Sequence, residues 1–361
     1  MAKKTYEICE IVGDGIGPEI MSAAKEVLKT VQDSLGFKLR YHLAPCGDKV
    51  KEETGTTIPE ESVEIFKRCD AALKGPIGDN VRDFVVGFRQ RYDLYANVRP
   101  AISYPSISPP ALRPDINLVV IRENSEGLYK SIENEVTDGV WTATGVYTIK
   151  ACERFAKFSF EYAKKRLEKG VGKGYVVVAT KKNIFRRTHG MFYEAFRKVS
   201  ENYPDIRFDH YYADAMCAYF VRRPQDFDVV ASENLLADLL SDLAGEVAGG
   251  LGMTAGTNTN PETKMGLFEP THGSAPDIVG TGKANPIGQI RSAALMLEFL
   301  GTVHGDNKCL AGSMLIEKAI ERLLTGEKKE NLPIELGGKS KTDDVAHRTA
   351  GYAGGQSAGQ K

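Results

Sequence analysis

The sequence predicts an α/β protein built around a mostly parallel β-sheet, and three observations lead to this fold class. Short apolar runs typical of strands alternate along the chain with amphipathic runs typical of helices. The runs at residues 118–121 and 175–179 are continuously apolar, as expected of strands that helices cover on both faces. Each run ends in polar residues and leads into another element, which is the repeating unit of a parallel sheet.

The first elements alternate regularly. Residues 6–12 are an apolar strand, residues 13–19 (GDGIGPE) turn the chain, and residues 18–35 carry apolar side chains at helical spacing. Residues 37–44 follow as a strand, and residues 59–69 as a helix whose acidic first turn suits the helix dipole. In open sheets of this kind, ligands bind at the carboxyl ends of the strands, so we expect a site there.

Further strands and an arm come next. Residues 71–78, 117–124, 174–183 and 226–236 read as strands that run into turns or polar ends. Residues 130–149 alternate β-branched and polar side chains around Asp138-Gly139, which predicts a β-hairpin arm. A hairpin alone is marginally stable in water, so we expect this arm to pair with a second chain.

Two later segments lack this regularity. Residues 267–286 read as a long loop punctuated by glycine and proline, and loops of this length are usually functional. From Gly337 onward the sequence loses its apolar periodicity, so we expect irregular structure there and mobility in the last ten residues.

Composition excludes several classes of function. The 361 residues suffice for two domains, and 47 basic against 48 acidic residues leave no charge excess for nucleic acid or an anionic membrane. No apolar run approaches the roughly 20 residues of a membrane span, and the N-terminus lacks a secretory signal pattern. The six cysteines are scattered without paired spacing, which favours reduced thiols in a cytoplasmic protein.

The run ENLLADLLSDLAGE carries the most informative pair of charges. Asp238 and Asp242 are four residues apart, so both carboxylates project from one face of a helix. Leucines on the neighbouring stripe place this pair at the border of the core, where two like charges repel unless a cation binds them. Mg²⁺ accepts such oxygen ligands, with Asp214 as a third candidate, although a solvated acidic face has the same pattern.

Other charged residues stand at the ends of elements. Arg89, Arg99 and Arg122 would grip a di- or tricarboxylate if they converge, whereas each alone reads equally as a surface residue. Lys181 follows a strand and could act as a base, and Tyr129 could donate a proton; a solvated lysine and a packed tyrosine are the alternatives.

The glycine-rich segments are ambiguous in the same way. The turn GDGIGPE lacks the third glycine of a dinucleotide-binding fingerprint, so an ordinary Rossmann site is disfavoured. In the later loop, backbone amides of residues 272–274 could cradle phosphates and Asp277 could accept hydrogen bonds from ribose hydroxyls.

Taken together, these motifs resemble those of a known family. GDGIGPE, RYDLYANVRP, VIRENSEGLY, ENLLADLLSD and EPTHGSAPDIVGTGKANP stand in the order found in the isocitrate and 3-isopropylmalate dehydrogenase family, over the chain to about residue 340. The resemblance implies a two-domain isopropylmalate-dehydrogenase-like fold with a central cleft. Residues 1–100 with 250–361 would form one domain, residues 101–249 the other, and residues 131–150 a dimer arm.

The resemblance also assigns roles to residues, in active sites that two subunits share. It implies that Arg89, Arg99 and Arg122 bind the malate carboxylates, that Lys181 of the partner removes the hydroxyl proton, and that Tyr129 protonates the carbon after CO₂ leaves. The implied Mg²⁺ or Mn²⁺ ligands are Asp238, Asp242 and the partner's Asp214. The implied cofactor contacts are His272, Gly273, Ser274, Ala275, Asp277, Ile278 and Asn285, and the further substrate contacts are Asn183 and Val85.

Cofactor and substrate follow from single positions. Asp277 and Ile278 stand where NADP-using relatives place lysine and tyrosine, so we expect NAD. Asp83 and Val85 stand where isocitrate enzymes place serine and asparagine, which favours an apolar substituent and therefore 3-isopropylmalate, the substrate of a leucine-biosynthesis step. Homoisocitrate, isocitrate, tartrate and D-malate remain as alternatives, and higher oligomers than the dimer remain open.

Some positions depart from the family pattern. Thr180 and Lys182 flank the candidate base, Arg186 and Arg187 follow it, and Arg82 replaces a glutamate of many bacterial isopropylmalate enzymes. A rival hypothesis is a non-catalytic regulatory subunit. The three aspartates, the three arginines, Lys181 and Tyr129 are all retained, which favours an enzyme.

Overall fold

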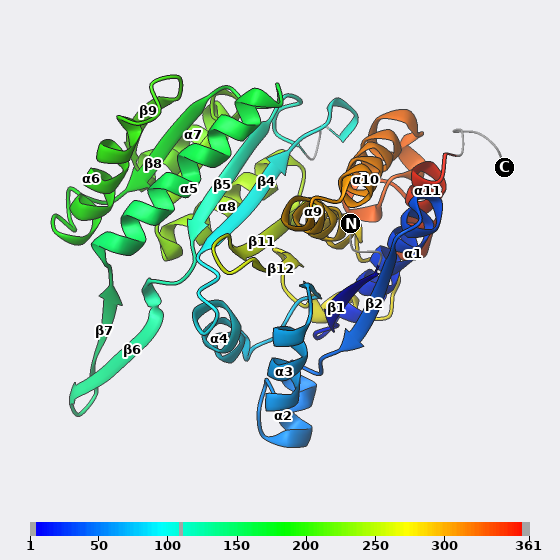
Figure 1. Cartoon of the computed structure of the whole chain (residues 1–361), viewed down its shortest axis with the longest axis horizontal. Helices are drawn as coiled ribbons and strands as arrows, with labels where there is room; N and C mark the ends of the chain where they lie inside the picture. Colours follow the sequence, from blue (N-terminus) through cyan, green and yellow to red (C-terminus); the bar gives the residue numbers. More distant parts are fainter. Residues whose placement is uncertain (1–4, 108–110, 356–361) are drawn as a thin grey trace.

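The computed structural model describes residues 5–107 and 111–355, and within them the chain forms one ten-stranded sheet and a two-stranded arm (Figure 1). The order in the large sheet is β2-β1-β3-β12-β11-β4-β5-β10-β8-β9. The strands are β1 (Thr5–Ile11), β2 (Lys38–Leu43), β3 (Ala71–Lys74), β4 (Ala96–Ile102), β5 (Asn117–Glu123), β6 (Gly127–Thr137), β7 (Val140–Val146), β8 (Tyr175–Thr180), β9 (Arg207–Tyr212), β10 (Val229–Ser232), β11 (Ala255–Asn260) and β12 (Met265–Pro270).

Helices cover both faces of this sheet, as the α/β prediction requires. They are α1 (Gly17–Leu35), α2 (Asp48–Thr54), α3 (Glu60–Arg68), α4 (Val81–Phe84), α5 (Ile149–Glu168), α6 (Thr188–Ser200), α7 (Ala213–Arg222), α8 (Asn234–Ala248), α9 (Ile287–His304), α10 (Asn307–Gly326) and α11 (Thr342–Ala353). A π-helical turn, Val85–Gln90, continues α4. Among the described residues, no helix is long and apolar enough to cross a membrane.

Two parallel sets of strands meet in an antiparallel centre. Strands β2, β1, β3 and β12 pair in parallel on one side, and β5, β10, β8 and β9 on the other. Strands β11 and β4 join the two sets through antiparallel pairs. The predicted parallel-rich sheet is therefore confirmed, whereas the division into two domains at about residues 100 and 250 stays a prediction.

The predicted hairpin is present, with shifted bounds. Strands β6 and β7 pair around Asp138-Gly139, and Gly139 has a φ of 71°, the left-handed conformation that glycine favours. The arm projects from the body of the protein (Figure 1) and begins at Gly127, and residues 149–150 already belong to α5. Its exposed apolar side chains include Ile132, Val136, Val140 and Trp141.

Two expectations about irregular segments were wrong. Residues 342–353 form α11, which packs beside α1 through small buried side chains such as Ala346, Thr349 and Ala350. Such a face lacks the large apolar side chains by which periodicity is recognised, although close packing of small residues buries it fully. Residues 267–270 belong to β12, so the loop begins at Thr271. Of the ten residues expected to be mobile, 356–361 lie outside the described part of the chain.

Candidate active site

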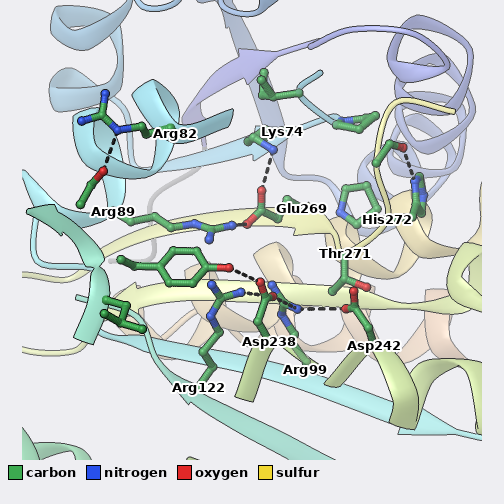
Figure 2. Close-up of a pocket in the computed structure, with 17 residues that line it drawn as sticks. Lys74, Arg82, Arg89, Arg99, Arg122, Asp238, Asp242, Glu269, Thr271 and His272 are labelled. Carbon is green, nitrogen blue, oxygen red and sulfur yellow. Dashed lines mark hydrogen bonds and ion pairs between the residues drawn. The ribbon is translucent and has the colours of Figure 1, made fainter. Parts of the chain in front are cut away.

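A cavity of about 510 Å³ lies where β3, β5 and β12 end, between the middle of β4, α8 and the base of the arm (Figure 2). Its described lining is Lys74, Pro76, Ile77, Arg82, Arg89, Arg99, Arg122, Leu128, Tyr129, Ser131, Asp238, Asp242, Glu269, Pro270, Thr271, His272 and Gly273. Three arginines, two aspartates and the tyrosine selected from the sequence therefore meet around one cavity. The three arginines, whose convergence the sequence spacing left open, thus line the same cavity.

Asp238 is the hub of the charged network. Arg99, near the middle of β4, donates from Nη1 to Oδ1 of Asp238 at 2.9 Å, and Arg122, on β5, donates to the same oxygen. Strands β4 and β5 are neighbours, with Asn97 opposite Arg122, which brings the two guanidinium groups together. Burial opposes ionisation of Asp238, but Arg122 and Arg99 outweigh it and hold its pKa below the ordinary value.

Asp242 sits one helical turn further along α8 and is less engaged. Its Oδ1 accepts a hydrogen bond from Nη1 of Arg99 at 3.3 Å, and its side chain is 51% exposed. Burial raises the pKa of Asp242, and the nearby Arg99 only partly offsets this. The i, i+4 spacing thus directs both carboxylates from the same face of α8, as predicted, and this face forms one wall of the cavity.

Tyr129 joins the same network from the base of the arm. Its hydroxyl donates to Oδ2 of Asp238 at 2.6 Å, and the guanidinium carbon of Arg122 lies 4.7 Å from the centre of its ring. Burial raises the pKa of Tyr129, so the phenol carries its proton at neutral pH. A proton donor therefore lies within reach of the residues that could bind a carboxylate.

A buried ion pair that the sequence did not suggest lies on the opposite wall. Glu269, at the end of β12, accepts hydrogen bonds from Nζ of Lys74 at 2.6 Å and from Arg89. The side chains of Lys74 and Glu269 are each 5% exposed. Lys74 closes the apolar strand AALK, which is the same strand-end signal that identified Arg122, and it could have been found in that way.

Lys181 and Asp214 lie away from the central cavity, where they contact each other. The ammonium group of Lys181, just after β8, contacts Oδ1 of Asp214, at the start of α7, at 2.8 Å. Neither residue lines the central cavity; Asn183 lines a separate surface depression of about 450 Å³ with Lys182 and Arg186. Among the described residues, no group of three acidic, histidine or cysteine side chains is placed to hold a metal ion.

The donor set nevertheless fits half of a divalent-cation site. Asp238 and Asp242 present hard carboxylate oxygens side by side at the cavity wall, and magnesium sites commonly use one or two carboxylates with substrate and water. The remaining ligands would have to come from outside this chain.

The loop after β12 is held by the first glycine turn. The Ile16 N–H donates to the Ser274 carbonyl at 2.9 Å, and a Cβ on Gly15 would lie 2.0 Å from that carbonyl oxygen. Gly15 has a φ of 57°, so the turn needs glycine both for its conformation and for this close approach. The GDGIGPE turn therefore helps to position the predicted cofactor loop. This is a structural role, which the sequence left open beside phosphate binding.

The residues of that loop differ in their surroundings. His272 lines the cavity, and its buried Nε2 has no hydrogen-bond partner within the described part of the chain, which fits a ligand at this point. Asp277 is exposed, and Ile278 packs beside Ile16 and Ala284. The side chain of Asn285 is buried, and its Nδ2 donates a hydrogen bond to Glu335 at 2.7 Å. Gly273 is exposed, whereas Ser274 and Ala275 are half-buried.

The two residues from which the preference for 3-isopropylmalate was inferred, Asp83 and Val85, are not among the described lining of the cavity. Asp83 accepts a hydrogen bond from Thr57 at 3.0 Å and does not line the cavity. Its carboxylate therefore gives no support to the expectation of a pocket that favours an apolar substituent. The side chain of Val85 lies outside the described residues, as does that of Val86. The described apolar lining of the cavity is Pro76, Ile77, Leu128 and Pro270.

Comparison with known proteins gives one consistent result. Residues 7–348 match the family model of isocitrate/isopropylmalate dehydrogenases. The chain is 43% identical to a 3-isopropylmalate/3-methylmalate dehydrogenase of Methanocaldococcus jannaschii, covering 96% of this chain and 98% of that one. It is 39% identical to an isocitrate/homoisocitrate dehydrogenase of Thermus thermophilus, covering 94% and 96%. The crystal structure of isocitrate dehydrogenase from Methylococcus capsulatus matches with a TM-score of 0.87 at 34% identity, covering 97% and 99%.

Proposed function

Because the chain belongs to the isocitrate/isopropylmalate dehydrogenase family, we propose that it oxidises and decarboxylates 3-isopropylmalate to 2-oxoisocaproate, using NAD and Mg²⁺ or Mn²⁺. The observation that carries this proposal is the meeting of Arg89, Arg99 and Arg122 with Asp238 and Asp242 around one cavity. Arginine forks bind carboxylates, and the aspartate pair suits a divalent cation. Several relatives that carry the name 3-isopropylmalate dehydrogenase, at 34–43% identity, support the choice of acid.

Each group of this chain takes one part of the reaction. Arg89, Arg99 and Arg122 bind the carboxylates of the malate and orient its hydroxyl-bearing carbon. Asp238 and Asp242 would hold a divalent ion that would supply Lewis acidity, and a bound nicotinamide would supply the hydride acceptor. Tyr129 keeps its proton, since burial raises its pKa, and gives it to the carbon from which CO₂ departs.

The proposed enzyme is a homodimer with shared sites. Lys181 and Asp214 do not line their own cavity, so in this proposal they serve the cavity of a second copy. The exposed apolar side chains of the arm support pairing with that copy, because such a surface is unfavourable in water. Lys181 of the partner subunit would accept the proton of the substrate hydroxyl. The scattered cysteines accord with a cytoplasmic enzyme.

Homoisocitrate or isocitrate is the second candidate, and one residue favours it. Arg82 lines the cavity on the side of Arg89 and across from Arg99 and Arg122, and its Nε donates to the Ser131 hydroxyl at 2.7 Å (Figure 2). A cation at that place suits a third carboxylate better than an isopropyl group. Replacing Arg82 with Leu should therefore raise the kcat/KM ratio of isopropylmalate to homoisocitrate by about tenfold.

The deciding experiment measures NADH formation by the purified chain with Mg²⁺. It compares 3-isopropylmalate, homoisocitrate, isocitrate, D-malate and tartrate. Turnover of isopropylmalate that EDTA abolishes supports the proposal. Turnover of another acid alone keeps the reaction and discards the substrate, and turnover of none favours a regulatory subunit.

A further inference from the structure

The segment that carries Lys181 is a tight turn between β8 and α6, here called the lysine turn (residues 181–187). Both peptide groups of Lys181 are bonded. Its carbonyl accepts hydrogen bonds from the N–H groups of Ile184 and Phe185, both at 3.0 Å. Its own N–H donates to Nδ1 of the His189 side chain at 3.0 Å. The side chain of one residue on α6 thus closes the turn around the lysine.

His189 is built into this place. Its side chain is buried, and its ring neighbours those of Phe185 and Tyr147, with centroids 5.0 and 5.6 Å away. A ring nitrogen that accepts an N–H bond carries no proton, so the proton of the neutral ring sits on Nε2. Burial lowers the pKa of His189 to about 4, which keeps the ring neutral and able to accept at working pH.

The hydrogen bond from the Lys181 N–H to His189 affects the position of the lysine amine because it fixes the backbone from which the side chain extends. With its N–H and carbonyl both fixed, the direction in which the side chain leaves the turn is also fixed. The ammonium group reaches Asp214 at 2.8 Å, and the lysine side chain is only 30% exposed. A shift of the turn would therefore move the Lys181 ammonium group relative to the Asp214 carboxylate.

We propose that His189 is a positioning residue, which holds the Lys181 peptide through Nδ1 and thereby sets where the lysine amine stands. The inference rests on the proposed function, in which Lys181 serves as the base. A histidine that merely fills the core would act through its volume, whereas this role needs an acceptor at the δ position of the side chain.

Three substitutions separate these roles. Asn places its Oδ1 near the position of the histidine Nδ1, Gln places its acceptor near Nε2, and Leu fills part of the volume without an acceptor. His347→Asn, at an exposed histidine on α11, is the control for the same exchange of residues elsewhere. Thermal unfolding of each variant identifies any that fails to fold. If the Leu variant fails to fold, the comparison between the Asn and Gln variants still tests the proposal.

The first readout is amide hydrogen exchange at Lys181, resolved by fragmentation mass spectrometry. We expect exchange about tenfold faster in H189Q and H189L than in the wild type, and near the wild-type rate in H189N and H347N. The second readout is turnover with the preferred acid. There kcat should fall about tenfold in H189Q and H189L, with KM changed less than about twofold, and should be restored in H189N.

Two results would overturn the proposal. One is slow exchange at Lys181 in the H189L or H189Q protein, and the other is equal kcat for H189N and H189Q. If the wild type oxidises none of the acids, the proposed function fails by itself. The exchange rate and the rate at which an amine reagent labels Lys181 then decide whether His189 sets the position of the lysine.

Discussion

Glu269 offers the sharpest test of how this site is held together. Its carboxylate is buried between Lys74, at 2.6 Å, and Arg89, and it also accepts a hydrogen bond from Asn258 at 2.8 Å. Replacing it with Gln keeps the shape and removes the charge. Lys74 and Arg89 are then left as two buried cations without this counter-ion, and breaking such a buried pair costs about 3–5 kcal/mol.

The matched variants give the expected order. Lys74→Met leaves Glu269 with Arg89 and Asn258, so we expect a milder loss of about 1–2 kcal/mol. The double variant K74M/E269Q removes one cation together with the anion, and it should be more stable than E269Q alone. Denaturant unfolding of the four proteins, with the wild type as reference, measures this order.

The pH dependence gives an independent check. Burial lowers the pKa of Lys74 and Glu269 counteracts this, so the pKa falls further in E269Q. A lysine whose folded-state pKa is lowered costs stability below that pKa, and the cost disappears as the pH rises to the unfolded value of 10.5. The deficit of E269Q should shrink as the pH rises. The reasoning would be refuted if E269Q were no less stable than K74M/E269Q and if its loss of stability did not change with pH.

Three further predictions concern other parts of the molecule. Burial raises the pKa of Glu123 to about 7 from 4.5, so its stabilising contribution is complete below pH 4.5 and is lost as the pH rises through 7. The stability of Glu123→Gln relative to the wild type should therefore increase by about 3 kcal/mol between those pH values, and a constant difference in denaturant midpoints would contradict this. Asp242→Asn removes a carboxylate from the candidate cation site, so the Mg²⁺ concentration for half-maximal activity should rise about tenfold or more; an unchanged Mg²⁺ titration would remove Asp242 from the site. Trp141, on the arm, is 65% exposed. Trp141→Asp should shift sedimentation from dimer to monomer and lower kcat, because Lys181 then reaches no cavity; a fully active monomer would disprove shared sites.

The sequence was sufficient for the residues whose geometry is local, whereas the meeting of the arginines depends on how the strands pair. The spacing of Asp238 and Asp242 on one helix determines their common direction. Arg99 and Arg122 stand on strands that follow each other closely in the chain, and such strands usually pair. This pairing brings the two guanidinium groups to one cavity, a meeting that the spacing of the residues alone left open.

Other positions depend on contacts that no local pattern contains. Glu269 escaped notice because the loop was expected to begin at residue 267, whereas β12 extends to Pro270 and carries this side chain into the cavity wall. The role of His189 depends on how α6 packs against the end of β8, eight residues after Lys181. The helix α11 was missed because its buried face consists of small residues, which signal burial only when the neighbouring α1 is known.

The charged network itself indicates how ligands enter the site. Asp238 holds Arg99, Arg122 and the Tyr129 hydroxyl at once, and burial together with Arg99 lowers the pKa of Arg122 to about 10. Two buried guanidinium groups side by side require an anion, and the aspartate supplies it within the chain. A carboxylate ligand can take over the arginines only if the aspartate finds another cation, because an unpaired buried charge is costly. If the proposed function holds, we therefore expect the substrate and the divalent ion to displace these internal partners together, and each to bind more tightly in the presence of the other.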